Sequence, residues 1–268
     1  MKMSLRTAAF FLLITMLSCR SEFEKIRTSG DATVMFEEAN KLFELKEYRK
    51  AITLYELIIP AYRGKREAED LYYKFADAHF KSGRYILSSH YFKTFADTYV
   101  NSPIREDALY NSAFSYYRIS PKHKLEQSNT EKAIEAFQMF ANTFPDSEKV
   151  VDCNKYIDEL RSKLEQKAFD SGKLYYHLLN YSSAIQTLEN MLKDYPGSPQ
   201  EEETRYLIAR SSYDWAENSI FLRQNERYHK TIERCESYEK KHPNGEYKEV
   251  IAEYKNKSQQ AIKQLEND

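Results

Sequence analysis

The sequence predicts an all-α protein: a right-handed α-solenoid of five helix pairs, closed at its C-terminal end by one further helix. Two observations predict this class. Glycine and proline are scarce, with 6 and 7 among 268 residues, so turns are few and helices should be long. Small residues also recur 37 positions apart, at Ala39, Ala76 and Ala113 and again at Gly172 and Ala209, which is typical of a repeat protein.

The composition limits the class of protein and of partner. Hydrophobic residues make up 41% of the chain and charged residues 30%, which is enough apolar material for a packed core and argues against disorder. The 40 Lys and Arg are balanced by 41 Asp and Glu, for a net charge of −1. Nucleic-acid binding usually needs a basic surface, so we expect no nucleic-acid partner.

The N-terminus has the pattern of an export signal over residues 1–18. Two basic residues precede an apolar run at 8–17, which is too short to cross a bilayer but suits a secretory signal. Ser18 before Cys19 resembles a bacterial lipoprotein processing site, so we expect Cys19 to carry the lipid and 19–31 to form a lipidated tether. Acyl chains would then hold the protein to the membrane. The alternative is an ordinary secreted protein in which Cys19 is incidental.

The first two repeats share a second small residue twelve positions after the first, with an aromatic residue four further on. These residues are Ala51 with Tyr55, and Ser88 with Phe92. The pattern resembles the tetratricopeptide repeat, in which small residues on helices A and B let the two helices of a pair approach closely. We therefore expect each repeat to be one such helix pair.

Repeats three to five each place a proline twelve residues after the small residue of helix B, at Pro145, Pro196 and Pro243, where it would end that helix. The spacing between the two small positions grows to twenty residues in repeat three and twenty-two in repeat five. The extra residues must be longer helices or loops. We expect a loop at 119–130, with Asn129 or Thr130 capping the next helix.

The last segment, 247–268, should be a capping helix for the open end of the solenoid. Its apolar residues fall on one stripe: Val250, Ile251, Tyr254, Ala261, Ile262 and Leu265.

Aromatic residues recur seven positions apart on helix A of every repeat, so both rings of a pair leave the helix on nearly the same face. The pairs are Phe36 and Phe43, Tyr73 and Phe80, Tyr110 and Tyr117, Phe169 and Tyr176, and Tyr206 and Tyr213. They could line a concave peptide-binding groove or pack against the neighbouring repeat, and the sequence leaves both open. Four cations beside the rings could meet a carboxylate: Arg118, Lys173, His177 and Arg210.

Residues for enzyme chemistry are missing from the sequence. No glycine-rich phosphate loop, nucleophile elbow or zinc-type histidine spacing occurs, so we expect no catalytic residue, no cofactor and no metal site. Cys153 and Cys235 could in principle form a disulfide, but we favour free thiols because Cys235 falls at an interior helical position. Binding is the remaining class of function.

Several short motifs, taken in order, resemble the BamD family, whose members are lipoproteins of the outer-membrane β-barrel assembly machine. The motifs are Phe144-Pro145-Asp146-Ser147, Tyr195-Pro196-Gly197-Ser198 and the 125–130 loop leading into Lys132-Ala133-Ile134. The lipoprotein signal and an enlarged third repeat among five add to the resemblance. The high Tyr and Lys content with a short Leu-Ser-Cys signal looks like the Bacteroidetes branch.

The resemblance implies a periplasm-facing, lipid-anchored scaffold at the cell outer membrane. Residues 32–150 would receive the C-terminal segments of unfolded outer-membrane proteins, and 151–268 would dock a BamA-like barrel protein of the Omp85 type. The implied substrate groove consists of Phe36, Phe43, Tyr73, Phe80, Tyr110, Tyr117 and Arg118. The implied docking residues are Tyr176, Lys193 and Arg205.

Three other lipoprotein classes remain as alternatives. A tetratricopeptide lipoprotein of pilus assembly or of cell division would usually keep a regular 34-residue spacing, unlike the 37-residue period found in this chain. A glycan-binding outer-membrane lipoprotein of the SusD type shares helical repeats and aromatic residues. Those chains are much longer and carry sugar-binding insertions for which this sequence has no room.

Overall fold

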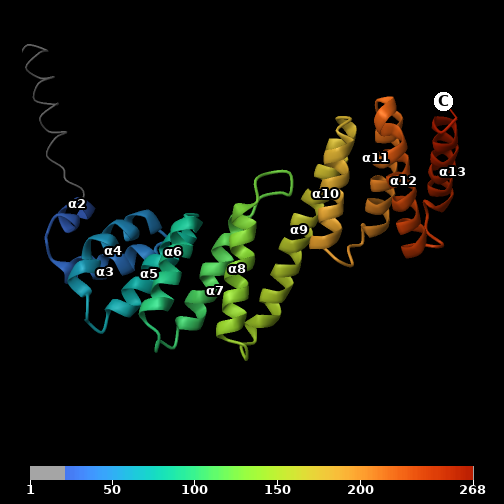
Figure 1. Cartoon of the computed structure of the whole chain (residues 1–268). Coiled ribbons are helices and arrows are strands. Elements are labelled where there is room, and N and C mark those ends of the chain that lie inside the picture. The colour runs from blue at the N-terminus through green and yellow to red at the C-terminus, as the bar shows by residue number, and fades with distance from the viewer. Residues whose placement is uncertain (1–21, 268) are drawn as a thin grey trace, which may run out of the picture. The chain divides into compact units, whose positions relative to one another are not determined.

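The computed structural model describes residues 22–267, and every regular element in this range is a helix (Figure 1). The predicted all-α class is therefore confirmed. The predicted signal at 1–18 and the lipidation site Cys19 lie outside the described residues. Residues 22–27, inside the predicted tether, form a short helix, α2 (Glu22–Arg27), whose Phe23 and Ile26 pack against the core of the first repeat.

The chain forms two compact units, and the boundary between them falls within a single helix. The first unit runs up to Ser120 and includes Ser128–Ile157. The second unit combines Pro121–Gln127 with the chain from Asp158 onward. The loop at 121–127 thus packs with the chain from residue 158 onward, whereas the residues on either side of the loop belong to the first unit.

The first unit contains the first three predicted helix pairs, followed by the start of a long helix. Each of the six helices of these pairs packs against the next one of the six along the chain. The helices are α3 (Ala32–Glu44) with α4 (Tyr48–Tyr62), α5 (Ala68–Lys81) with α6 (Tyr85–Thr98), α7 (Arg105–Ile119) with α8 (Ser128–Thr143), and the beginning of α9 (Lys149–His177).

The second unit contains the last two helix pairs and the capping helix. It comprises the end of α9, then α10 (Tyr181–Asp194), α11 (Glu201–Glu217), α12 (Phe221–Lys241) and α13 (Lys248–Leu265). The capping helix α13 packs on both α12 and α11, and its Ile251 and Ile262 are buried. Val250 is exposed instead of joining this apolar stripe.

The small residues found by the repeat search lie where helices cross. Their solvent exposure is zero for the alanines at 39, 51, 76, 113, 133, 184 and 209. At Gly172 a Cβ atom would collide with the side chain of Leu188 on α10. Because a larger side chain at these crossings would hold the helices apart, the spacing of small residues in the sequence is a direct consequence of helix packing.

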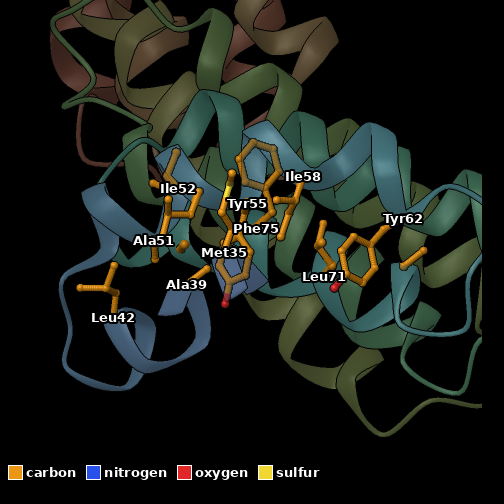
Figure 2. Close-up of a cluster of buried hydrophobic side chains, with 13 residues drawn as sticks. Met35, Ala39, Leu42, Ala51, Ile52, Tyr55, Ile58, Tyr62, Leu71 and Phe75 are labelled. Carbon is orange, nitrogen blue, oxygen red and sulfur yellow. The ribbon is translucent and has the colours of Figure 1, made fainter. Parts of the chain in front are cut away.

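The aromatic residue of helix B fills the space that the small residues leave. Figure 2 shows the core of the first repeat, where Tyr55 of α4 lies among residues of α3 and α5, including Ala39 and Phe75. Tyr55 is fully buried, and its hydroxyl donates a 2.9 Å hydrogen bond to Oδ1 of Asn40. The polar end of this ring is therefore satisfied inside the core.

The two enlarged repeats use their extra residues differently. In repeat three they form the loop that precedes α8, as expected, but α8 begins at Ser128. The predicted capping residues Asn129 and Thr130 therefore lie inside its first turn, and the buried Thr130 hydroxyl instead bonds Ser120 at 2.7 Å. In repeat five the extra residues lengthen the helices, since α11 has 17 residues, α12 has 21 and only residues 218–220 connect them.

Three of the A helices end in the same left-handed turn, although glycine occupies it only once. The residue with positive φ in this turn is Lys46 (62°) after α3, Gly83 (78°) after α5 and Leu179 (58°) after α9. At Leu179 the backbone N–H donates to the carbonyl of Tyr176 at 2.9 Å, and the N–H of Asn180 donates to that of Tyr175 at 2.9 Å. These bonds satisfy the last carbonyl groups of α9 and fix the turn.

Candidate functional site

The six aromatic residues of the predicted groove are all half-buried side chains on the A helices of the first unit. In the first repeat, Phe36 packs against Tyr62 with ring centroids 5.1 Å apart, and Phe43 packs against Tyr48 at 5.5 Å. Both partners come from α4, the other helix of the same repeat. These two rings therefore serve mainly to pack their own helix pair.

Tyr73 is held by two neighbouring helices. Its ring lies 5.3 Å from that of Phe92 and 5.6 Å from that of Phe95, both on α6. Its hydroxyl accepts a 3.2 Å hydrogen bond from Nδ2 of Asn111 on α7. Burial raises the pKa of Tyr73 to about 12, so the ring is a neutral packing element with limited access to a ligand.

The remaining predicted rings belong to a continuous series of stacked side chains. Phe114 lies at its centre, 6.0 Å from Phe80, 6.1 Å from Tyr110 and 5.7 Å from Tyr117. Tyr156 of α9 continues the series at 4.5 Å from Tyr117. All five rings are half-buried. We call these five residues the aromatic stripe.

Two members of the aromatic stripe were missed by the sequence analysis. Phe114 lies between the two predicted positions on its helix, so the spacing Tyr110, Phe114, Tyr117 is itself a helical stripe and could have revealed it. Tyr156 lies at the start of α9, sixteen residues before the repeat position Gly172. No repeat signal pointed to it.

The predicted cationic contact, Arg118, follows the aromatic stripe on α7 and is exposed. Its Nη2 donates a 3.2 Å hydrogen bond to the hydroxyl of Tyr85, and its guanidinium carbon lies 5.5 Å from the centre of that ring. These contacts hold the charge at the surface of the first unit, where an anion could reach it.

The three predicted docking residues of the second unit have unlike surroundings. The hydroxyl of Tyr176 donates a 2.7 Å hydrogen bond to Asp214, and burial raises the pKa of Tyr176 to about 12. Arg205 forms a 2.9 Å ion pair with Glu201 on its own helix, and Lys193 is exposed near the end of α10. Tyr176 and Arg205 therefore have separate partners and do not form a shared cluster.

The other cations that the sequence placed beside aromatic rings do contact them. Lys173 lies 5.0 Å from the ring centre of Phe169 and pairs with Glu203 at 3.2 Å. Arg210 lies 4.9 Å from the ring centre of Tyr176. Their charges are already engaged within the second unit.

Cys153 and Cys235, the two cysteines between residues 22 and 267, are free and fully buried, as favoured from the sequence. Burial raises the pKa of Cys153 to about 11 and that of Cys235 to about 12. Both are therefore protonated, unreactive thiols at neutral pH. Within residues 22–267, no group of three or more His, Cys, Asp or Glu side chains is placed to hold a metal ion.

Comparison with known families identifies the chain. The family model described as "YfiO: Outer membrane lipoprotein" matches residues 28–205, which is more than half of the 268 residues. The chain belongs to the YfiO family of outer membrane lipoproteins. This YfiO-family chain is also 21% identical over 207 residues to the outer membrane protein assembly factor BamD of Rickettsia prowazekii (strain Madrid E), a match that covers 77% of this chain and 82% of that protein. The expected BamD-family assignment is confirmed.

Solved tetratricopeptide structures resemble this YfiO-family chain more distantly. One is the TPR2AB-domain:pHSP90 complex of yeast Sti1, with a TM-score of 0.38 and 13% identity over 85% of this chain and 98% of that one. Another is the P58(IPK) TPR domain, with a TM-score of 0.40 and 16% identity over 97% and 75% of the two chains. Both TM-scores are low, so the family assignment rests on the family model and the curated relative.

Membership of the YfiO family associates the chain with the outer membrane. Of the helices between residues 22 and 267, none is both long and apolar enough to cross a bilayer.

Proposed function

We propose that the chain is a non-enzymatic scaffold lipoprotein of outer-membrane β-barrel assembly, anchored through Cys19 and facing the periplasm. Membership of the outer membrane lipoprotein family supports the membrane association. The similarity to a protein named as an outer membrane protein assembly factor supports the role in assembly.

In this proposal, the first unit receives the C-terminal segments of unfolded outer-membrane proteins on the aromatic stripe. The observation that carries this assignment is the continuous series of ring contacts from Phe80 through Phe114 to Tyr156. The last strand of a transmembrane barrel alternates apolar and polar residues, and half-buried rings offer faces to such side chains at small entropic cost. Arg118, which follows the stripe on α7, would meet the terminal carboxylate.

The second unit docks the barrel protein of the Omp85 type in this proposal. Among the three residues suggested for this contact, Lys193 is the exposed one. Tyr176 acts through its bond to Asp214, which joins α9 to α11, and Arg205 through its 3.4 Å bond to Ser237 of α12.

The experiment that tests the proposal is purification of the native lipoprotein in mild detergent, with mass spectrometry of its stoichiometric partners. We expect recovery of a barrel protein of the Omp85 family. Recovery of pilus, division or glycan-import proteins in its place would contradict the assembly role and leave the repeat fold unaffected.

A peptide experiment tests the substrate surface separately. A peptide copying the last strand of an outer-membrane protein is titrated against the full chain, once with a free carboxylate and once amidated. Arg118→Gln should weaken binding of the free acid by roughly fivefold and leave the amide unchanged. The matched control is Arg63→Gln, which alters an exposed arginine of the same unit. It should change the affinity for neither peptide. Equal effects on both peptides would remove Arg118 from the site.

A further inference from the structure

The second unit holds a cavity of about 500 Å³ between the 121–127 loop and the C-terminal half of α9. Two contacts fix the loop against the helix. Nζ of Lys167 donates a 2.5 Å hydrogen bond to the carbonyl of Leu125, and His123 lies 3.0 Å from Asp170. The buried side chain of Gln127 closes the loop with bonds to the carbonyls of Lys122 and Leu125 at 2.8 and 3.0 Å. The cavity therefore has a fixed wall on each side.

Positive charge dominates the cavity lining. Three lysines, Lys124, Lys167 and Lys173, line it together with a single carboxylate, Asp170. That carboxylate already has His123 as its partner. Lys124 is an exposed side chain of the loop, and the ammonium of Lys167 keeps two further donors after its bond to the loop carbonyl. An anionic group entering the cavity would meet these two lysines first.

Exposed leucines occur on the two segments that form the cavity, the loop and the end of α9. Leu174 lines it and is 57% exposed, and Leu125 on the loop is 60% exposed. At the end of α9, Leu178 and Leu179 are 64% and 70% exposed, and the hydrogen-bonded left-handed turn keeps them there. A single exposed leucine needs no explanation, but one leucine in a cationic cavity and three more next to its lining residues in sequence indicate a surface that contacts something apolar.

We propose that this cavity binds the head group of an anionic phospholipid. The phosphate would lie among the lysines, and the four leucines would enter the boundary between head groups and acyl chains. Basic side chains next to protruding apolar ones are the combination that favours an anionic membrane surface. Family membership associates the chain with the outer membrane, so a lipid surface lies within reach. The inference does not rest on the assembly role, since a lipid site could exist in any lipoprotein of this fold.

Vesicle binding tests the inference directly. The mature chain from residue 19, carrying Cys19→Ser so that no acyl chain is attached, is mixed with phosphatidylcholine vesicles with or without phosphatidylglycerol. We expect binding only when phosphatidylglycerol is present, and weaker binding at high salt. Lys124→Gln should lower the partition coefficient about fivefold, the effect of one lysine near an anionic surface. Leu174→Ser with Leu178→Ser should lower it on the order of tenfold.

Matched controls separate this site from general surface effects. Lys240→Gln removes an exposed lysine of α12, and Val151→Ser removes an apolar side chain that is 74% exposed on α9. Both should bind vesicles as the unaltered chain does. Absence of binding to phosphatidylglycerol, equal binding to neutral vesicles, or equal losses in test and control variants would each overturn the inference. It would also be overturned if the leucine variant kept full vesicle binding and lost a stoichiometric protein partner, because the surface would then be a protein contact.

Discussion

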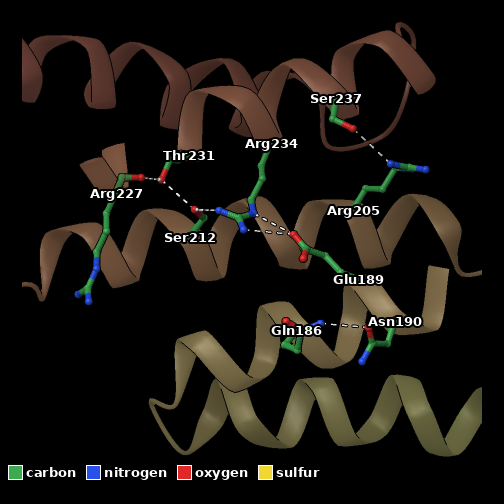
Figure 3. Close-up of polar contacts among 9 residues, drawn as sticks. All are labelled: Gln186, Glu189, Asn190, Arg205, Ser212, Arg227, Thr231, Arg234 and Ser237. Atoms are coloured by element: carbon green, nitrogen blue, oxygen red, sulfur yellow. Dashed lines mark hydrogen bonds and ion pairs between the residues drawn. The ribbon is translucent and has the colours of Figure 1, made fainter. Parts of the chain in front are cut away.

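Arg234 of α12 forms an ion pair with Glu189 of α10, and both Nε and Nη2 lie 3.2 Å from Oε1 of the carboxylate (Figure 3). The third nitrogen, Nη1, donates a 3.1 Å hydrogen bond to the hydroxyl of Ser212 on α11. Thr231 donates to the same hydroxyl at 3.0 Å. One guanidinium therefore connects three helices of the second unit.

We expect Arg234→Gln to lower the free energy of unfolding by about 1 kcal/mol. The two charged side chains are partly exposed, which limits the gain from their attraction, and Ser212 keeps Thr231 as a partner. The control is Arg223→Gln, whose arginine is 62% exposed and pairs only within its own helix, with Glu226; its effect should be near zero. Urea unfolding of the chain measures the loss of stability in both variants. Equal midpoints for the two would contradict a linking role for Arg234.

Gly172→Ala should destabilise the second unit by about 1 to 3 kcal/mol, the usual range for overpacking. The added methyl group would collide with the side chain of Leu188, which is fully buried and has no room to move. Alanine is otherwise the better helix former, so a loss of stability identifies the collision as its cause.

A double variant provides the control for this prediction. Leu188→Ala alone should cost about 2 to 5 kcal/mol through the cavity it leaves. Combined with Gly172→Ala it should cost less than the sum of the two single losses, because the new methyl group enters the vacated space. Strict additivity in thermal unfolding would show that the two positions do not touch.

The helix pairs were predictable because their packing requires particular residue types at regular positions in the sequence. Close crossing of two helices requires a small side chain at a fixed place, and Ala39, Ala76, Ala113 and Ala209 are all fully buried at such crossings. The period of 37 residues records one full helix pair with its turns. Prolines after helix B add an independent sign of where each pair ends, because a following proline cannot continue a helix.

The site was less predictable because it depends on contacts between distant residues. A seven-residue spacing shows from which face of its own helix a ring projects. It does not show which ring of the neighbouring helix it contacts. Tyr73 thus lies against Phe92 and Phe95, whereas Tyr117 lies against Tyr156 on α9. The packing of the 121–127 loop against α9 is a contact between segments about forty residues apart in sequence, for which a period search has no signal.

We expect His79 to make the stability of the first unit depend on pH. Its ring is 3% exposed, lies 4.7 Å from Phe75 and 5.0 Å from Tyr91, and has no hydrogen-bond partner among the described residues. Burial, with a smaller effect of Arg84, lowers its pKa from 6.5 to about 4. Because the unfolded chain takes up this proton more readily, the contribution of His79 to stability should be complete above about pH 6.5 and should fall as the pH approaches 4, by on the order of 3 kcal/mol.

The variant His79→Leu should remove that pH dependence while keeping the stability at pH 7. Leucine fills the site without an unsatisfied polar atom, and it cannot be protonated. The matched control is His90→Leu, which alters an exposed histidine on α6 and should leave the pH profile as it is. Urea unfolding at a series of pH values between 4 and 7 measures the slope. A slope that survives in His79→Leu would assign the acid sensitivity to other groups.

Phe114 decides whether the aromatic stripe acts as one binding surface. If a peptide spreads its aromatic side chains along the stripe, Phe114→Leu should weaken peptide binding by about fivefold, the value of one aromatic contact. The control is Tyr99→Leu, which alters a half-buried ring of the same unit that contacts Tyr72 and Phe95 outside the stripe. Circular dichroism checks that both variants keep their helices, and titration with the barrel-strand peptide measures affinity. Because both changes remove comparable ring packing, equal affinities for the two variants would mean that the stripe only holds the helices together.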